Sequence, residues 1–132
     1  MNNFVKRVIE GNGITPPIIC LNAFNSNFND TINVEWFDRA DHFEAIFYKD
    51  NLEHIAIFDL SGSLVEYKLF LPVEFLPEAI KTYLESKGEI MNSVLINKGN
   101  TIEYEVIVRD ANFTRYLILL SDLGKVIEEK KL

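Results

Sequence analysis

Apolar residues recur at every second position in the middle of the chain. Phe43, Ala45 and Phe47 are each separated by one residue, a period that predicts a β-strand. Two further runs, over residues 52–59 and 64–70, have strand length and are rich in apolar and aromatic side chains. The pattern therefore predicts three consecutive strands.

Short turns join these strands. Asp50-Asn51 is a pair of residues that tolerate left-handed backbone, as a two-residue hairpin turn requires. The next turn has Asp59 at its first position and Gly62 at its fourth, where a type I turn favours them. Three strands joined in this way form an antiparallel meander.

Two segments carry helical signals. Thr15, followed by two prolines, is predicted to cap a first helix. A second helix is predicted over residues 77–87, and Gly88 is predicted to end it in a left-handed conformation. The apolar face of the first helix carries Cys20, Leu21, Phe24 and Phe28.

Further strands complete both halves of the chain. Ile32, Val34 and Trp36 alternate with polar residues before the meander, which predicts a strand with these three side chains on one face. Each half then has one helix followed by four strands. The strands of the second half are predicted over residues 90–96, 101–109, 114–120 and 125–130.

The two halves follow the same order of elements. Pro17 and Pro77 each lie at the start of a predicted helix, and Gly62 and Gly124 each hold the fourth position of a closing turn, where positive φ is expected. We therefore predict an α+β fold: a tandem repeat of helix plus four-stranded antiparallel sheet, with the helices on one side.

The predicted organisation is one compact unit made of an arm and two repeats. The arm covers residues 1–14, the first repeat residues 15–71 and the second repeat residues 72–132. A single curved sheet around one helix, as in cystatins, is the alternative fold. The number of strands and the second helix favour the repeat.

The composition indicates a globular chain with an acidic surface. Hydrophobic residues make up 48% of the 132 residues, which excludes a disordered chain. The formal net charge of −7 argues against a nucleic-acid partner, whose phosphates require basic patches. No uncharged segment is long enough to insert into a membrane. Cys20 is the only cysteine, so no intrachain disulfide forms, and its apolar surroundings predict a buried, inert thiol.

The sequence contains no constellation of catalytic or metal-binding residues. His42 and His54 are the only two histidines, and no cysteine or third histidine joins them, so a transition-metal site is not expected. The aspartates lie in or beside turns, where their side chains bond backbone amides. We predict no enzymatic activity, no catalytic residues, no bound metal and no cofactor.

The feature that bears on function is the sheet face opposite the expected core. If Phe43, Ala45 and Phe47 pack beneath the helix, the side chains between them point the other way. Antiparallel sheets usually have one polar face, but this second face is apolar with charges among its apolar groups. The predicted binding residues on it are Phe37, Glu44, Ile46, Tyr48, Ile55 and Ile57.

Two functions are compatible with such a face. The first is a non-catalytic binding module that recognises a protein or peptide with the sheet face, through an apolar centre and a charged rim. The alternative is a small-molecule carrier that encloses an apolar ligand between sheet and helices. The second repeat, the N-terminal arm or the mate in a homodimer would also cover an apolar face of this kind.

Five segments carry a family resemblance: VEWF at 34–37, FEAIFYKDN at 43–51, IAIFDLSG at 55–62, LPEAIKTYL at 76–84 and YEVIVRD at 104–110. They resemble the PepSY-like, beta-lactamase-inhibitor-like periplasmic proteins of Bacteroidetes, over about residues 15–132. The resemblance implies tandem helix-plus-sheet units and an exported, non-enzymatic protein that binds another protein. Residues 1–13 lack an apolar core followed by a cleavage site, so a secretory leader is not expected. The paired cysteines of the true inhibitors are absent.

Overall fold

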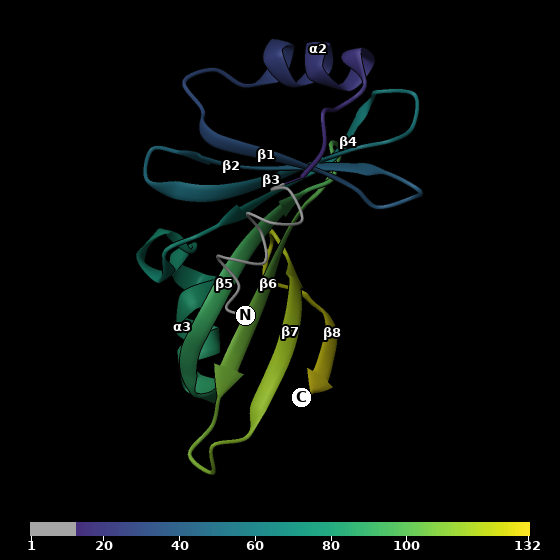
Figure 1. Cartoon of the computed structure of the whole chain (residues 1–132). Helices are drawn as coiled ribbons and strands as arrows, with labels where there is room; N and C mark the ends of the chain where they lie inside the picture. Colours follow the sequence, from purple (N-terminus) through teal and green to yellow (C-terminus); the bar gives the residue numbers. More distant parts are fainter. Residues whose placement is uncertain (1–12) are drawn as a thin grey trace, which may run out of the picture. The chain divides into compact units, whose positions relative to one another are not determined.

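The structure is a computed structural model that describes residues 13–132. The arm predicted over residues 1–14 lies outside the described residues except for its last two. Within the described part the fold is α+β, with two α-helices and eight strands (Figure 1). The chain divides into two compact units, which we call unit 1 (Met1–Tyr67) and unit 2 (Lys68–Leu132).

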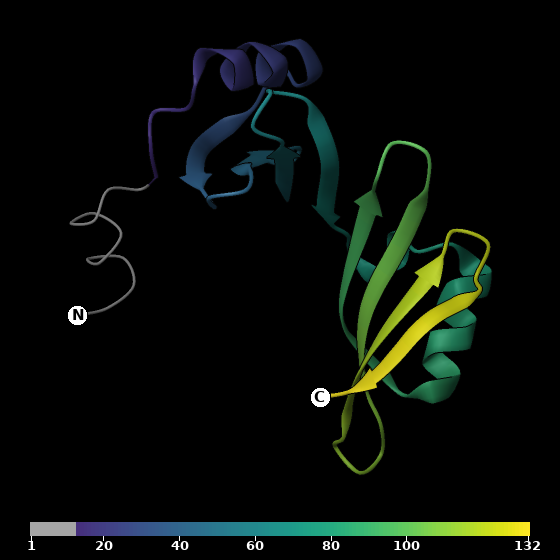
Figure 2. The same ribbon diagram turned by 90° about the vertical axis from the view of Figure 1, so that its right-hand side faces the viewer.

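Unit 1 packs one helix on one face of a sheet. The strands are hydrogen-bonded in chain order, and β1–β2 and β2–β3 are antiparallel pairs. Both views place the helix on a single face of these strands (Figures 1 and 2). The elements are α2 (Ile18–Asn27), β1 (Ile32–Asp38), β2 (Phe43–Lys49), β3 (Leu52–Phe58) and β4 (Leu64–Phe70), whose last residues lie past the boundary of the unit.

Unit 2 also packs one helix on antiparallel strands in chain order. Ile80 and Leu84 of its helix are buried against Tyr104, Val106 and Ile118 of the sheet. The elements are the short 3-10 helix η1 (Val73–Phe75), then α3 (Glu78–Lys87), β5 (Glu89–Asn97), β6 (Ile102–Arg109), β7 (Arg115–Ser121) and β8 (Val126–Lys131).

Aromatic rings fill the space between α2 and the sheet of unit 1. The ring of Phe24 lies edge-on to Phe47 at 5.1 Å and to Trp36 at 5.6 Å, measured between centroids. Trp36 in turn lies 5.4 Å from Phe58. Cys20 is fully buried in the same cluster. These contacts confirm that Cys20 and Phe24 form the inner face of the first helix and fix which face of the sheet is core.

His54 belongs to this core as well, with both ring nitrogens satisfied. Its Nε2 lies 3.1 Å from the carbonyl oxygen of Lys49, its Nδ1 contacts the Tyr67 hydroxyl, and the ring stacks between Phe47 and Tyr67. The Lys49 carbonyl oxygen can accept a hydrogen bond from Nε2, and Nδ1 can share one with the Tyr67 hydroxyl. Burial, and then the charge of Asp50, raise the pKa of Tyr67.

The start of the first helix differs from the prediction. Pro17 is the N-cap in place of Thr15, and no side chain caps the helix. The carbonyl oxygen of Pro17 accepts hydrogen bonds from Cys20 and Leu21, both at 3.0 Å. Because a residue before a proline is held in extended conformation, Pro16 cannot take the first helical position after a Thr15 cap, and the helix starts behind Pro17.

The first strand also differs from the predicted alternation. The pairing of β1 with β2 shifts register between Ile32 and Glu35, and Asn33 in this stretch has a φ of 56°. An extra residue of this kind is a β-bulge, which changes the side that later residues face. Trp36 therefore reaches the core, whereas Ile32 and Val34 are exposed.

Gly88 ends α3, but its conformation is not left-handed. Its φ of 160° is extended backbone, so Gly88 is the C-cap, as predicted, but the left-handed conformation predicted for it is wrong. A Cβ at this position would lie 2.3 Å from the carbonyl oxygen of Arg109. The glycine is needed there because two segments of backbone approach closely.

The two turns of the meander are as predicted. Asp50 and Asn51 have φ values of 53° and 66°, which a two-residue hairpin turn requires. The Asp59 carboxylate accepts hydrogen bonds from the Ser61 hydroxyl at 2.6 Å and from the Ser61 and Ser63 amides at 3.0 and 2.9 Å. These bonds, the one from the Ser61 hydroxyl first, lower the pKa of Asp59.

Gly124 has the positive φ that the turn pattern predicted, +89°. Gly124→Val is expected to lower the free energy of unfolding by about 1–2 kcal/mol, because left-handed backbone strains a β-branched residue. An added Cβ would meet Ile80 at 3.6 Å, an ordinary contact, so backbone strain dominates the cost. Urea unfolding measures the effect. Gly124→Asn is the control and should cost less; a Gly124→Val midpoint equal to wild type would contradict the assignment.

Asp59 should make the stability of the fold sensitive to acid. Because its pKa is lowered, its contribution is present above the ordinary aspartate value of 3.8 and is lost as pH falls through the lowered value. Asp59→Asn is therefore expected to lower the melting temperature at neutral pH, and the difference should shrink as the pH falls below 3.8. Asp122→Asn, in the corresponding turn of unit 2, is the control. A deficit for Asp59→Asn that does not change with pH would rule out this role for the charge.

Candidate binding face of unit 1

The side chains of unit 1 that point away from α2 form a second sheet face, which we call the open face. The register aligns Phe37 with Glu44 and Ile57 across β1, β2 and β3, and the next row aligns Glu35 with Ile46. These residues alternate with the buried core residues and so lie on the opposite side. The open face consists of Glu35, Phe37, Glu44, Ile46, Tyr48, Glu53, Ile55 and Ile57.

All six residues predicted as a binding surface lie on the open face. Phe37 comes from β1, and β2 and β3 supply the others. Tyr48 is 41% exposed, and the other five are half-buried. The register thus brings the predicted residues together, and their role in binding stays a prediction.

A hollow of about 580 Å³ opens on this face. Three of the six predicted residues line it: Phe37, Ile46 and Tyr48. It is wide enough for one or two side chains of a partner and combines apolar walls with carboxylates. Its full lining is Asn33, Val34, Glu35, Phe37, Ile46, Tyr48 and Glu53.

Four lining residues were not among those predicted: Asn33, Val34, Glu35 and Glu53. Asn33 and Val34 lie within the bulge of β1, so they reach the hollow only because the strand departs from regular alternation. The one signal in the sequence is the asparagine itself, a residue that adopts left-handed backbone more readily than most. Glu53 pairs with Tyr48 across β2 and β3, so alternation along the hairpin already places it on this face, although it was not predicted as a binding residue.

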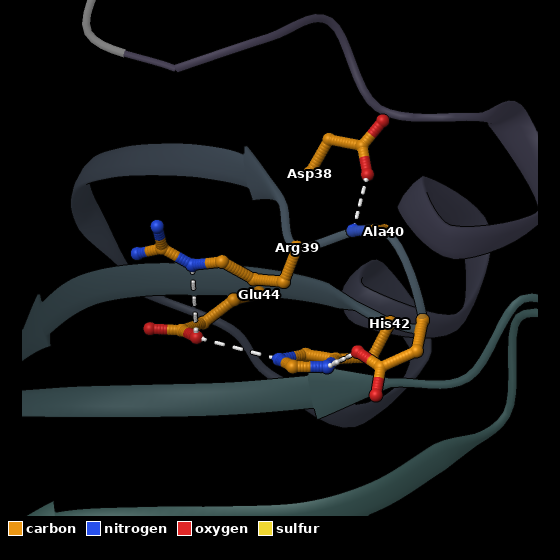
Figure 3. A network of polar contacts seen from close by, with 6 residues as sticks. Asp38, Arg39, Ala40, His42 and Glu44 are labelled. Atoms are coloured by element: carbon orange, nitrogen blue, oxygen red, sulfur yellow. Dashed lines mark hydrogen bonds and ion pairs between the residues drawn. The ribbon is translucent and has the colours of Figure 1, made fainter.

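A polar network lies beside the hollow, at the turn between β1 and β2 (Figure 3). Glu44 Oε2 lies 3.4 Å from Nε of Arg39 and 3.7 Å from Nε2 of His42. The other imidazole nitrogen, Nδ1, lies 2.6 Å from Asp41 Oδ1. Asp38 Oδ1 accepts a hydrogen bond from the amide of Ala40 at 2.9 Å. Glu44 is therefore held in place by its neighbours, and its role in binding stays a prediction.

Arg39 links this network to the apolar part of the open face. Its guanidinium carbon lies 4.8 Å from the centre of the Phe37 ring, a cation–π contact. Partly exposed ion pairs such as Arg39–Glu44 contribute at most about 1 kcal/mol to stability. The main effect of the network is therefore to place charges at the rim of the open face, and its contribution to the stability of the fold is small.

Within residues 13–132, no group of three or more His, Cys, Asp or Glu side chains could hold a metal ion. Burial, and then the charge of Asp59, raise the pKa of the Cys20 thiol, which keeps it protonated and a poor nucleophile. In the same part of the chain, no helix has the length and apolar character needed to cross a membrane.

Comparison with known proteins identifies the fold. No protein-family model matches the chain, and no curated protein matches its sequence. A BLIP-like (beta-lactamase-inhibitor-protein-like) protein from Bacteroides fragilis superposes with a TM-score of 0.79 at 16% identity, covering 94% of this chain and 92% of that one. The fold is BLIP-like. A DUF2874 family protein from Bacteroides uniformis gives a TM-score of 0.81 at 19% identity, covering 89% and 90%.

A third structure with the BLIP-like fold comes from Bacteroides eggerthii and is named as a candidate periplasmic protein. It gives a TM-score of 0.81 at 15% identity and covers 89% of this chain and 90% of that one. At these identities the likeness shows the fold and not the function. The BLIP-like part of the resemblance seen in the sequence is thereby supported, whereas a kinship with PepSY-like proteins stays a prediction.

Proposed function

We propose that this chain is a non-catalytic binding module that recognises an extended protein or peptide segment with the open face of unit 1. The observation that carries the proposal is the hollow, where Phe37, Ile46 and Tyr48 lie beside the carboxylates of Glu35 and Glu53. An apolar centre with a charged rim is typical of protein interfaces, and an exposed tyrosine is a frequent anchor in them.

The alternative, a carrier that encloses an apolar ligand between sheet and helix, has less support. In unit 1 that space holds the rings of Phe24, Trp36, Phe47 and Phe58, with centroids 5.1–5.6 Å apart. Packing at this density leaves a ligand no room unless the core opens. A homodimer, in which a second copy covers the open face, is the other candidate occupant.

The two units have the features expected of copies of one ancestral repeat. In each, an α-helix precedes four strands. Gly62 and Gly124 both have a φ of +89°, and each amide donates to the carbonyl oxygen three residues earlier, at 3.0 and 2.9 Å. We infer a duplication on this basis. Superposition of the two units in an experimental structure tests it, and different strand directions would refute it.

An exported location is the corresponding proposal for the cell. It is supported by the name of the Bacteroides eggerthii neighbour, which refers to the periplasm. Fractionation of cells that express the natural reading frame tests it. Recovery of the protein in the cytoplasmic fraction alone would refute it.

The double substitution Ile46→Ser with Tyr48→Ser tests the proposed face. Because Tyr48 is 41% exposed and Ile46 half-buried, we expect the melting temperature to fall by no more than about 5 °C. Peptides selected from a display library on the wild-type chain should lose binding to this variant, because the anchor and its neighbour are removed. Fluorescence anisotropy of the selected peptides measures the affinity.

The matched control replaces two exposed apolar residues outside the face, Leu60→Ser with Leu123→Ser, which are 60% and 92% exposed. This variant should bind the selected peptides as the wild type does. If the Ile46→Ser, Tyr48→Ser variant unfolds, the open face is part of the core and the proposal fails. If both variants bind equally, the peptides use another surface.

A further inference from the structure

We propose that residues 1–12 of this chain dock on the open face of unit 1 and occupy its hollow until a partner displaces them. This inference rests on the proposed function in one respect: a face that binds an extended segment of a partner is the face that would bind the chain's own arm. Residues 1–12, which we now call the arm, would then act as an internal competitor of the partner.

The described chain begins next to the hollow. The amide of Ile14 donates a hydrogen bond to the carbonyl oxygen of Trp36 at 2.8 Å, so the chain passes along the free edge of β1. The residue before Trp36 in that strand, Glu35, lines the hollow. From Ile14 the chain goes on to α2, which lies on the other face. Gly13 and Ile14 therefore lie at the edge strand whose residues Asn33, Val34, Glu35 and Phe37 line the hollow.

Only glycine fits at position 13, where the chain approaches the edge of β1. Its φ is +109°, and a Cβ added to it would lie 2.0 Å from the carbonyl oxygen of Trp36. No other residue fits there without moving the backbone of β1. The contact fixes the point at which the arm is attached, so the arm starts within a few ångströms of the surface it is proposed to cover.

The arm is long enough to cross the open face. Twelve residues in extended conformation span up to about 40 Å. Four strands at ordinary spacing measure about 15 Å from first to last. Even a partly extended arm can thus reach from β1 past β3.

The composition of the arm matches that of the hollow. The sequence from Phe4 to Ile9 is FVKRVI, in which four apolar residues flank the basic pair Lys6-Arg7. The hollow has apolar walls, and the ionisable groups that line it are the carboxylates of Glu35 and Glu53 with the Tyr48 phenol. A basic pair between apolar residues complements both the apolar walls and the carboxylates of the hollow. The aliphatic stems of Lys and Arg pack on apolar surface while their charged ends contact carboxylates.

A competition experiment on the full chain tests the proposal. The probe is a fluorescent synthetic peptide with the natural sequence of residues 1–12. In the Lys6→Glu, Arg7→Glu chain, the arm is repelled from the carboxylates and should leave the hollow free. This chain is expected to bind the probe at least about tenfold more tightly than wild type, because a tethered arm competes at high effective concentration.

Two further variants, both made in the Lys6→Glu, Arg7→Glu chain, locate the site. Adding Glu35→Gln with Glu53→Gln should abolish binding of the probe. Adding Glu128→Gln with Glu129→Gln, two exposed carboxylates of β8, is the matched control and should leave the affinity unchanged. Equal binding of the probe to wild type and to the Lys6→Glu, Arg7→Glu chain, or no binding to either, overturns the proposal.

Tryptic cleavage after Lys6 and Arg7 gives a second readout that does not depend on the probe. In the otherwise wild-type chain, Glu35→Gln with Glu53→Gln should raise the initial rate of cleavage about tenfold, because the docked arm is released. Tyr48→Ser should act in the same direction if the glutamate variant does not fold. An unchanged rate in a folded variant overturns the proposal, as does protection that grows with protein concentration, which would assign the arm to a second copy.

The outcomes separate this inference from the proposed function. If library peptides bind the open face and the probe does not, the proposed function is supported. Residues 1–12 are then not the occupant of the hollow. If the probe binds and no library peptide competes with it, docking of the arm is supported. Recognition of a partner by the open face is then refuted.

Discussion

The two-residue turn at Asp50 and Asn51 sets the side on which every residue of β2 and β3 lies. With φ values of 53° and 66°, the turn pairs Lys49 with Leu52 and so fixes the register of the two strands. Side chains alternate with a period of two, so a slip by one residue would exchange the core with the open face. The Nε2 of His54 reinforces the turn from inside the core by its hydrogen bond to the Lys49 carbonyl.

Once that register is set, a single helix can cover only one of two apolar faces. The packing of Phe24 against Trp36 and Phe47 commits α2 to one side. Ile46 and Tyr48 are then left on the other side, where apolar surface gains no contact with the helix. Retaining such residues costs solubility, and the carboxylates beside them, together with a net charge of −7, offset that cost. The topology therefore leaves this apolar face without cover from α2, whatever its partner is.

Much of the fold could be read from the sequence because it rests on local signals. Turn residues such as Asp59 and Gly62 act through their own backbone, and period-two alternation predicted the inner face of β2 and β3. The errors arose where a local signal was overridden. Thr15 is a good cap, but the prolines after it forbid a helix there. Gly88 is the C-cap of α3, but glycine is required there by the distant carbonyl oxygen of Arg109 and not by left-handed backbone.

The candidate site was predictable as a face but not as a hollow, for the same physical reason. Alternation assigns side chains to one side or the other and describes a regular surface. A hollow needs a departure from regularity, which the bulge of β1 supplies by placing Asn33 and Val34 at its wall. Whether a bulge forms depends on how two strands pair with each other, and a single asparagine in one of them is weak evidence for it. The shape of the hollow therefore depends on backbone geometry at Asn33, whereas its chemistry depends on the register fixed by the Asp50-Asn51 turn, at the same end of β2.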